Sequence, residues 1–388
     1  MATDGPEDLL VIGGGIQGLA TALVAAERGY RATLLERDTL GAGASASWFR
    51  ILHGGLRYLQ TLDLPRFRES VRERRWFLRA GLEGVEVRPF LMPLYGQGLK
   101  RSEVFRIAFA MDALAGLDRN AGVDAALRLN AGRVVSSDTV RAMFPQVRGD
   151  GLRGGALWNE AVVTDDRRFF MSFAAKVRDA GVTLVEGVRD LQLLTEGGAV
   201  AGLQGTVDGA AQHWRAPKVI NATGAWGGAV ARQLDPRFSR AWPGCIGFNL
   251  VLDREPLSTA GVSLLPPDVR GDMLFMQPLG GQTFAGTWYV PHSGDPEQIA
   301  PSEANIATAL DMLNAAVPGA AFQRDAVVRV TTGVLPVETV GGTDLRNRGV
   351  IHAHDTTGGP EGLFSVWGVK YATARAQGGK VLDAAGLS

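Results

Sequence analysis

Residues 9–36 read LLVIGGGIQGLATALVAAERGYRATLLE: an apolar strand, a glycine turn, a helix and a second strand that ends in an acid. This order is typical of the unit that holds the adenosine half of a dinucleotide. Gly13 permits the tight turn, Gly15 lets the backbone approach a pyrophosphate, and Gly18 lets the helix pack against the strand. The N-terminus of the helix offers unpaired N–H groups and a partial positive charge to the phosphates.

Glu36 narrows the choice of dinucleotide. It lies eighteen residues after Gly18, where a carboxylate can accept hydrogen bonds from ribose hydroxyls and would repel a 2′-phosphate. FAD or NAD therefore fits better than NADP. Because glycine accounts for 51 of the 388 residues, the glycine spacing alone is weak evidence. The strand, the helix and the acid around it make the prediction specific.

The length and the charge balance exclude several classes of protein. A chain of 388 residues is long enough for two domains with substantial cores. Hydrophobic residues make up 46% and charged residues 21%, which is typical of a soluble globular protein. Forty basic and forty acidic residues cancel, so no overall charge favours nucleic acid or acidic membranes. We therefore expect a small-molecule substrate and no nucleic-acid partner.

No metal site is expected. Cys245 is the single cysteine, which excludes an intramolecular disulfide, and it is expected to be a small buried hydrophobe. The five histidines show no metal-ligand spacing. His352 and His354 alternate along a predicted strand, so they would point to opposite faces.

The sequence also predicts no transmembrane segment. No apolar run approaches the roughly 20 residues of a spanning helix, and the acidic N-terminus does not resemble a secretory signal. A cytoplasmic location is the expectation. The apolar helix predicted at 104–115 favours a core or interface position, and a position on a membrane surface stays open as the alternative.

Further helices are predicted at 64–82, 166–180 and 302–316, and near the end of the chain to about residue 385. Strands are predicted at 87–95, broken by Pro89 and Pro93, and at 152–158, 161–164, 182–188 and 363–367. A hairpin is predicted from 190–195 and 200–207.

Five more segments follow the glycine motif in order along the chain. They are ILHGGLRYL (51–59), VTDDRRF (163–169), VINATGAW (219–226), FAGT (284–287) with GDP (294–296), and FSVWGVKYAT (364–373). Together these segments resemble the FAD-dependent glycerol-3-phosphate dehydrogenases, in the wider family that includes D-amino acid oxidase and sarcosine oxidase. The resemblance spans nearly the whole chain and favours FAD over NAD.

The resemblance implies an α/β fold. A Rossmann-like FAD-binding domain of the glutathione-reductase type would be interleaved with a mainly antiparallel β substrate domain that carries helices. The FAD-binding domain is expected to comprise 1–85, 150–240 and 325–388, and the substrate domain 86–149 and 241–324.

The resemblance also implies which residues hold FAD. Gly13, Gly15 and Gly18 would hold the pyrophosphate, Glu36 the ribose, and Val188 would pass the adenine. The turn 368–373 would hold the ribityl chain and the isoalloxazine. The full expected set is Gly13, Gly15, Ile16, Gln17, Gly18, Glu36, Arg37, Ala44, Ser45, Val188, Ala222, Thr223, Gly224, Gly368, Val369, Lys370, Tyr371, Ala372 and Thr373.

His53, Arg57, Arg348 and Lys370 match positions that border the family's substrate site. His53 is the candidate base, since imidazole titrates near neutral pH, or it only positions a neighbour. Arg57 would bind a substrate anion or pair with a structural acid. Lys370 would contact the flavin or a substrate oxyanion. Arg348 could be replaced in this role by Arg346.

Three aromatic residues are candidates for the substrate pocket. They are Tyr58, Trp288 and Tyr289, although large aromatic side chains are as often part of a core.

Departures from the family pattern argue against glycerol 3-phosphate as the substrate. Leu335 stands in place of the arginine that grips phosphate, and IGFN at 246–249 lacks the family's lysine and histidine. Ala374 replaces a tyrosine, and the sequence ends near the end of the flavin domain, so the family's C-terminal helical domain is not expected. Burying a phosphate dianion with too few cations costs several kcal/mol.

The sequence therefore predicts hydride transfer from a secondary alcohol that bears a polar or anionic group, such as a 2-hydroxy compound, to flavin, giving a ketone. Oxidation of an amine or amino acid is the alternative, and a non-catalytic flavin-binding subunit is the second alternative. The electron acceptor (oxygen, a quinone or another compound) stays open.

Overall fold

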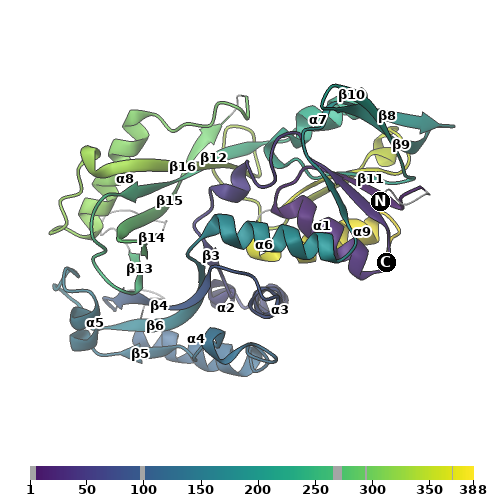
Figure 1. Ribbon diagram of the computed structural model, residues 1–388. Coiled ribbons are helices and arrows are strands. Elements are labelled where there is room, and N and C mark those ends of the chain that lie inside the picture. The colour runs from purple at the N-terminus through teal and green to yellow at the C-terminus, as the bar shows by residue number, and fades with distance from the viewer. Residues whose placement is uncertain (1–5, 97–100, 265–272, 293–294, 369) are drawn as a thin grey trace.

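The computed structural model describes residues 6–96, 101–264, 273–292, 295–368 and 370–388. Within these residues the strands form sheets of six, nine and three strands. Figure 1 shows the six-stranded sheet with α1, α6 and α9 at the right, and the nine-stranded sheet extending to the left. The first described residues of the chain and its C-terminus lie beside the six-stranded sheet (Figure 1).

The six-stranded sheet has the order β17-β18-β11-β1-β2-β7. Every neighbouring pair is parallel except β17 and β18. The strands are β1 (Leu9–Ile12), β2 (Ala32–Leu35), β7 (Thr183–Val185), β11 (Val219–Asn221), β17 (Val350–Ala353) and β18 (Leu363–Trp367). Apolar side chains cover both faces of β1, as expected for a central parallel strand.

Helices cover one face of this sheet. They are α1 (Ile16–Glu27), α6 (Asp166–Asp179) and α9 (Ala374–Ala384), and their buried side chains form one core with Leu9 and Val11. On the other face, Leu10 and Ile12 pack with the three-stranded sheet and α7. That layer comprises β8 (Arg189–Glu196), β9 (Ala199–Val207), β10 (Ala210–Arg215) and α7 (Gly227–Leu234).

The glycine turn makes the contact between α1 and β1 possible. Gly13 has φ +106, a conformation that side chains rarely adopt. A Cβ on Gly18 would lie 1.9 Å from the carbonyl oxygen of Gly13. The helix therefore approaches the strand to a distance that only glycine permits at this position.

The nine-stranded sheet is mainly antiparallel. Its order is β16-β12-β15-β14-β13-β4-β6-β3, with β5 paired to β6, and only β13 and β4 run parallel. The strands are β3 (Ile51–Leu52), β4 (Val85–Leu94), β5 (Arg133–Val135), β6 (Gly154–Val163), β12 (Gly244–Leu252), β13 (Gly261–Leu264), β14 (Leu274–Leu279), β15 (Gln282–His292) and β16 (Val327–Pro336). Helix α8 (Glu303–Ala316) packs in its core.

The predicted division of the chain needs correction at three strands. The segments 1–85, 150–240 and 325–388 were expected to build the FAD-binding domain, but β3, β6 and β16 within them pair in the nine-stranded sheet. Strand β6 pairs with β4 along ten residues. Pairing between distant segments therefore moves these strands to the other sheet.

Two strand predictions were also wrong in detail. Strand β4 is continuous through Pro89 and Pro93. Because the two prolines lie four residues apart, the N–H groups that they lack would both point to the same edge of the strand. On one side β4 pairs with β6 along its whole length, and on the other it pairs with β13 only at Phe90 and Leu91. The strands predicted at 152–158 and 161–164 are the single strand β6.

The predicted helices are confirmed with small shifts at their ends. They are α3 (Leu64–Arg79), α4 (Ser102–Ala115), α6, α8 and α9, alongside the short α2 (Leu56–Gln60) and α5 (Ser137–Met143). Asp165 caps α6 by accepting from the backbone N–H of Arg168. Ser302 and Asn305 form a reciprocal capping box at α8. No helix in the described part of the chain is long and apolar enough to span a bilayer.

The prediction for the paired histidines was wrong. Strand β17 ends at Ala353, and His354 begins a 3-10 turn. The rings of His352 and His354 therefore lie 4.7 Å apart rather than on opposite faces. Cys245 is buried, as predicted, and burial raises the pKa of its thiol to about 11.

The contact between α1 and β1 leads to the first prediction. Gly18→Ala should destabilise the fold by about 1–3 kcal/mol, because the new methyl group overlaps the Gly13 carbonyl. Thermal unfolding and bound flavin after gel filtration measure the effect. Gly319→Ala is the matched control, since no heavy atom lies within 4 Å of the added Cβ there. Equal stability of the two variants would contradict this account of the turn.

Candidate active site

A cavity of about 590 Å³ opens beyond the carboxyl ends of the parallel strands. Its walls come from the glycine turn after β1, from the segments after β2, β11 and β18, and from β12, β15 and β16 of the other sheet. Ligands of doubly wound sheets bind at this edge, and the volume is typical of a small-molecule site.

Most residues expected to hold FAD line this cavity. They are Gly13, Gly15, Ile16, Gln17, Glu36, Arg37, Ala44, Ser45, Val188, Ala222, Thr223, Gly224, Gly368, Lys370 and Tyr371. Gly18 lies inside the helix contact instead. Ala372 is buried in the core, and Thr373 lies in the turn that precedes α9, so neither lines the cavity. Val369 lies outside the described residues.

The cavity wall near the glycine turn has the groups that a dinucleotide needs. The Glu36 carboxylate accepts from the backbone N–H groups of Gly14 and Asp38, which fixes it at the cavity edge. The Ser45 hydroxyl accepts from Ile16 N at 2.9 Å, at the N-terminus of α1. A Cβ on Gly15 would approach Ser45 Oγ alone, at 3.1 Å, so the backbone is open to a ligand there.

Two buried polar atoms in the cavity wall, Gln17 Oε1 and Trp48 Nε1, have no hydrogen-bond partner within the described residues. The Gln17 side chain donates to Thr21 Oγ1 and to the Ala374 carbonyl, while its Oε1 accepts no hydrogen bond. Buried acceptors are normally satisfied. The orphaned Gln17 oxygen, the glycine turn and Glu36 together fit a bound dinucleotide.

Lys370 brings a group of cations to the cavity wall. Its Nζ lies 4.2 Å from the ring centroid of Tyr58, and the Arg66 guanidinium lies 4.4 Å from the same centroid. Desolvation by the surrounding protein atoms, and then the positive charge of Arg57, lower the pKa of Lys370 to about 8, although the residue is exposed at the cavity. Arg57, Arg66 and Lys370 are called the cation cluster below.

Two arginines here carry no acid partner within the described residues. Arg57 and Arg348 are exposed, and neither side chain forms an ion pair or a hydrogen bond with a described group. Arg66 donates to the backbone carbonyl of Asn347 at 2.7 Å, which brings the Arg348 loop to the cluster. Arg346 is already engaged, since it donates to the Val337 carbonyl and pairs with Glu338.

His53 belongs to a different contact group. Its side chain is 51% exposed, and Nδ1 lies 3.6 Å from Oε1 of the buried Glu160. His53 is not among the residues that line the cavity. The structure therefore joins Lys370 with Tyr58 and Arg57, and it places His53 beside an acid that the sequence analysis did not single out.

The nine-stranded sheet forms an uncharged wall of the cavity. Asn249, Thr287, Tyr289 and Leu335 line it, and are called the neutral wall below. Thr287 Oγ1 donates to Asn249 Oδ1 at 2.7 Å, and Asn249 Nδ2 donates to Thr331 Oγ1 at 3.0 Å.

The prediction that Trp288 lines the substrate pocket was wrong. Side chains alternate along β15, so Trp288 points away from the face that carries Thr287 and Tyr289. Its ring stacks on Phe248 with centroids 5.5 Å apart, within the core of the nine-stranded sheet.

Sequence reasoning missed Glu160, Arg66 and Asn249. A single acid inside the apolar strand 154–163 is a signal that could have identified Glu160, because a buried charge needs partners. Arg66 lies in a helix rich in arginine, where no local pattern distinguishes one from the next.

The fold and the cavity define a dinucleotide-binding oxidoreductase. The family model for FAD dependent oxidoreductases, DAO, matches residues 8–376. The chain therefore belongs to this family, and FAD is its cofactor.

Known proteins agree with this assignment. Glycerol-3-phosphate dehydrogenase 1 of Mycobacterium tuberculosis is 32% identical over 400 residues, covering 99% of this chain and 74% of the relative. A glycerol-3-phosphate dehydrogenase from Bacillus halodurans, solved with FAD, has a TM-score of 0.74 at 20% identity, covering 99% of this chain and 65% of that one. Glycine oxidase from Bacillus cereus has a TM-score of 0.62 at 18% identity, covering 98% and 95%. These two structural similarities support the fold alone.

The position of Lys370 predicts a pH dependence. Because its pKa is lowered to about 8 from 10.5, the ammonium loses its proton as the pH rises through about 8. The affinity for a small anion whose charge is constant over that range, acetate for instance, should fall by up to roughly tenfold, the weight of one charged contact. Isothermal titration of the holoprotein at several pH values measures it.

Lys370→Arg is the control for this dependence, since a guanidinium stays charged throughout. The variant should bind acetate without the loss of affinity near pH 8. The same pH dependence in the variant as in the wild type would show that another group titrates.

Proposed function

We propose that this protein oxidises the secondary alcohol of a small anionic compound to a ketone, with FAD as the hydride acceptor. The observation that carries the proposal is the cation cluster, which reaches the wall of the FAD cavity through Lys370 and in which Arg57 and Lys370 lack an acid partner within the described residues. Unpaired cations in a concave site favour an anionic ligand. The relative named glycerol-3-phosphate dehydrogenase supports an alcohol as the reacting group.

Each residue has a separate task in this proposal. Arg57 binds the anionic group of the substrate, because a guanidinium can donate two parallel hydrogen bonds to a carboxylate or phosphate. Lys370 stabilises negative charge on the reacting oxygen. His53, which lies outside the residues that line the cavity, takes the hydroxyl proton as general base where the substrate extends toward Arg57. When bound, FAD supplies a two-electron acceptor for the hydride that leaves the same carbon.

The neutral wall supports a substrate other than glycerol 3-phosphate. Leu335 points into the cavity at the position where the resemblance implies an arginine, and the rest of this wall is uncharged. Placing a phosphate dianion against it would leave charge unpaired. A monoanion, such as a 2-hydroxycarboxylate with an uncharged substituent, fits this arrangement better.

Anaerobic mixing of the yellow holoprotein with a panel of compounds tests the proposal. Bleaching of the flavin band by a 2-hydroxycarboxylate is the expected result. Bleaching by amino acids instead would show C–N oxidation, and no bleaching by either class would indicate a non-catalytic flavin protein. Admitting air or a soluble quinone to the reduced protein then identifies the acceptor.

The role of Arg57 predicts the effect of its removal. Arg57→Ala should weaken substrate binding by roughly 10- to 100-fold, which is the weight of a charge-assisted hydrogen bond, and should leave the flavin bound. The concentration dependence of bleaching gives the affinity. Arg106→Ala, an exposed arginine on α4, is the charge-matched control. Loss of the yellow colour in Arg57→Ala would show that this residue serves the cofactor instead.

The neutral wall predicts a gain of function. Leu335→Arg should increase bleaching by sn-glycerol 3-phosphate relative to the 2-hydroxycarboxylate by roughly tenfold or more, because it restores a cation to the wall. Leu335→Met conserves volume and should leave the preference unchanged. If the arginine variant prefers the same substrate as the wild type, Leu335 does not face the anionic group.

A further inference from the structure

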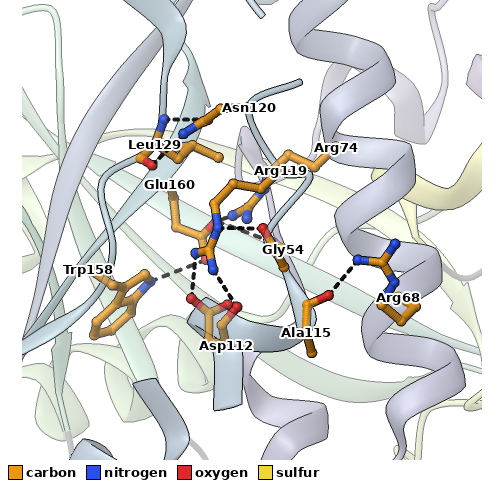
Figure 2. Close-up of polar contacts among 11 residues, drawn as sticks. Gly54, Arg68, Arg74, Asp112, Ala115, Arg119, Asn120, Leu129, Trp158 and Glu160 are labelled. Carbon is orange, nitrogen blue, oxygen red and sulfur yellow. Dashed lines mark hydrogen bonds and ion pairs between the residues drawn. The ribbon is translucent and has the colours of Figure 1, made fainter. Parts of the chain in front are cut away.

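Glu160 is a buried carboxylate that lies between the HGG segment (53–55) and α3. It is 4% exposed and comes from the middle of β6. Figure 2 shows Glu160 with Arg74, Gly54 and Trp158 around it. None of the residues assigned above to the cofactor or the substrate explains why an acid is buried here.

The two oxygens of Glu160 have different partners. Oε2 accepts from Arg74 Nη1 at 2.7 Å and from the backbone N–H of Gly54 at 3.3 Å. Oε1 accepts from Trp158 Nε1 at 3.2 Å and faces His53 Nδ1 at 3.6 Å, longer than a hydrogen bond. Arg74 therefore fixes the carboxylate through one oxygen, and the other oxygen is presented to the imidazole.

The glycine at position 54 fits this arrangement. A Cβ on Gly54 would lie 2.1 Å from Arg74 Cζ, so the guanidinium packs directly on the backbone next to His53. Arg74 itself is 5% exposed. The ion pair thus fixes both the acid and the loop that carries the histidine.

The carboxylate stays ionised in this setting. Burial raises the pKa of Glu160, but the contacts with His53, Arg74 and Trp158 together outweigh it and bring the pKa below its usual value. An ionised carboxylate can only accept, so the nitrogen that faces it is favoured to carry a proton.

We propose that Glu160 is a positioning residue that fixes the tautomer of His53, with the proton on Nδ1 and the lone pair on Nε2. The lone pair on Nε2 is then the one available to accept a substrate proton. This inference rests on the proposed role of His53 as base, but the tautomer itself can be observed without any substrate. Carboxylates fix the tautomer of histidines in the same way in metal sites and catalytic triads.

Glu160→Gln should reverse the tautomer. Arg74 and Gly54 both donate to the Oε2 position, whereas Trp158 alone donates to Oε1, so the charged Arg74 donor favours the amide oxygen of glutamine at the Oε2 position. The amide NH₂ then occupies the Oε1 position and donates toward His53 Nδ1. The neutral imidazole is therefore expected to carry its proton on Nε2 in the variant.

Long-range ¹H–¹⁵N spectra of the histidine-labelled holoprotein, recorded where imidazoles are neutral, distinguish the two tautomers. The chain has five histidines, so the spectrum contains few imidazole signals. The signal that disappears in His53→Gln is the signal of His53. We expect Nδ1–H in the wild type and Nε2–H in Glu160→Gln. Trp158→Phe removes a donor to the carboxylate but leaves it in place, so Nδ1–H should persist there.

Two results would overturn the inference: Nε2–H in the wild type, or an unchanged tautomer in Glu160→Gln. If Glu160→Gln does not fold, the wild-type spectrum alone shows whether His53 carries its proton on Nδ1.

Flavin bleaching separates the inference from the proposed function. Glu160→Gln should slow bleaching by roughly 10²- to 10⁴-fold, the usual weight of a general base, without weakening substrate binding. A reversed tautomer with unchanged bleaching would refute the role of His53 as base and leave the positioning role standing.

Discussion

A Cβ on Gly18 would lie 1.9 Å from the Gly13 carbonyl oxygen, and the cofactor end of the site depends on the space that this glycine leaves empty. Because α1 can press against β1, its N-terminus faces the cavity beside Glu36 and Ser45. The parallel strands β7, β11 and β18 end at the same edge of the sheet as β1, so the segments after them supply Val188, Thr223 and Gly368 to the same walls. One backbone contact therefore positions the groups that hold the dinucleotide.

Charge is distributed unevenly around the cavity, and this distribution is what gives the site its chemistry. The cation cluster gathers around Tyr58 and reaches the cavity through Lys370, whereas the neutral wall offers only amide, hydroxyl, phenol and aliphatic groups. Away from the N-terminus of α1, this distribution favours a substrate anion beside Lys370. The buried ion pair of Arg74 and Glu160 packs against the HGG segment on its interior side and fixes the position of the carboxylate that faces His53.

The sequence predicted well what local patterns determine. The unit 9–36, the strand β18 and the helices α6 and α8 follow from neighbouring residues, and the structure has them. The predictions from sequence failed where pairing between distant segments determines the structure. Strand β6 joins the nine-stranded sheet because β4 pairs with it, and alternation along β15 turns Trp288 into the core. Glu160 forms an ion pair with Arg74, which lies 86 positions away in the sequence, and no local pattern predicts such a pairing.

The most direct measurement is a crystal structure of the FAD complex. The account predicts that one FAD occupies the cavity, with its adenosine at Glu36 and Val188 and its isoalloxazine ring beside Lys370, within reach of the cation cluster and the neutral wall. An isoalloxazine ring placed away from Lys370, or a cavity that FAD does not enter, would contradict it.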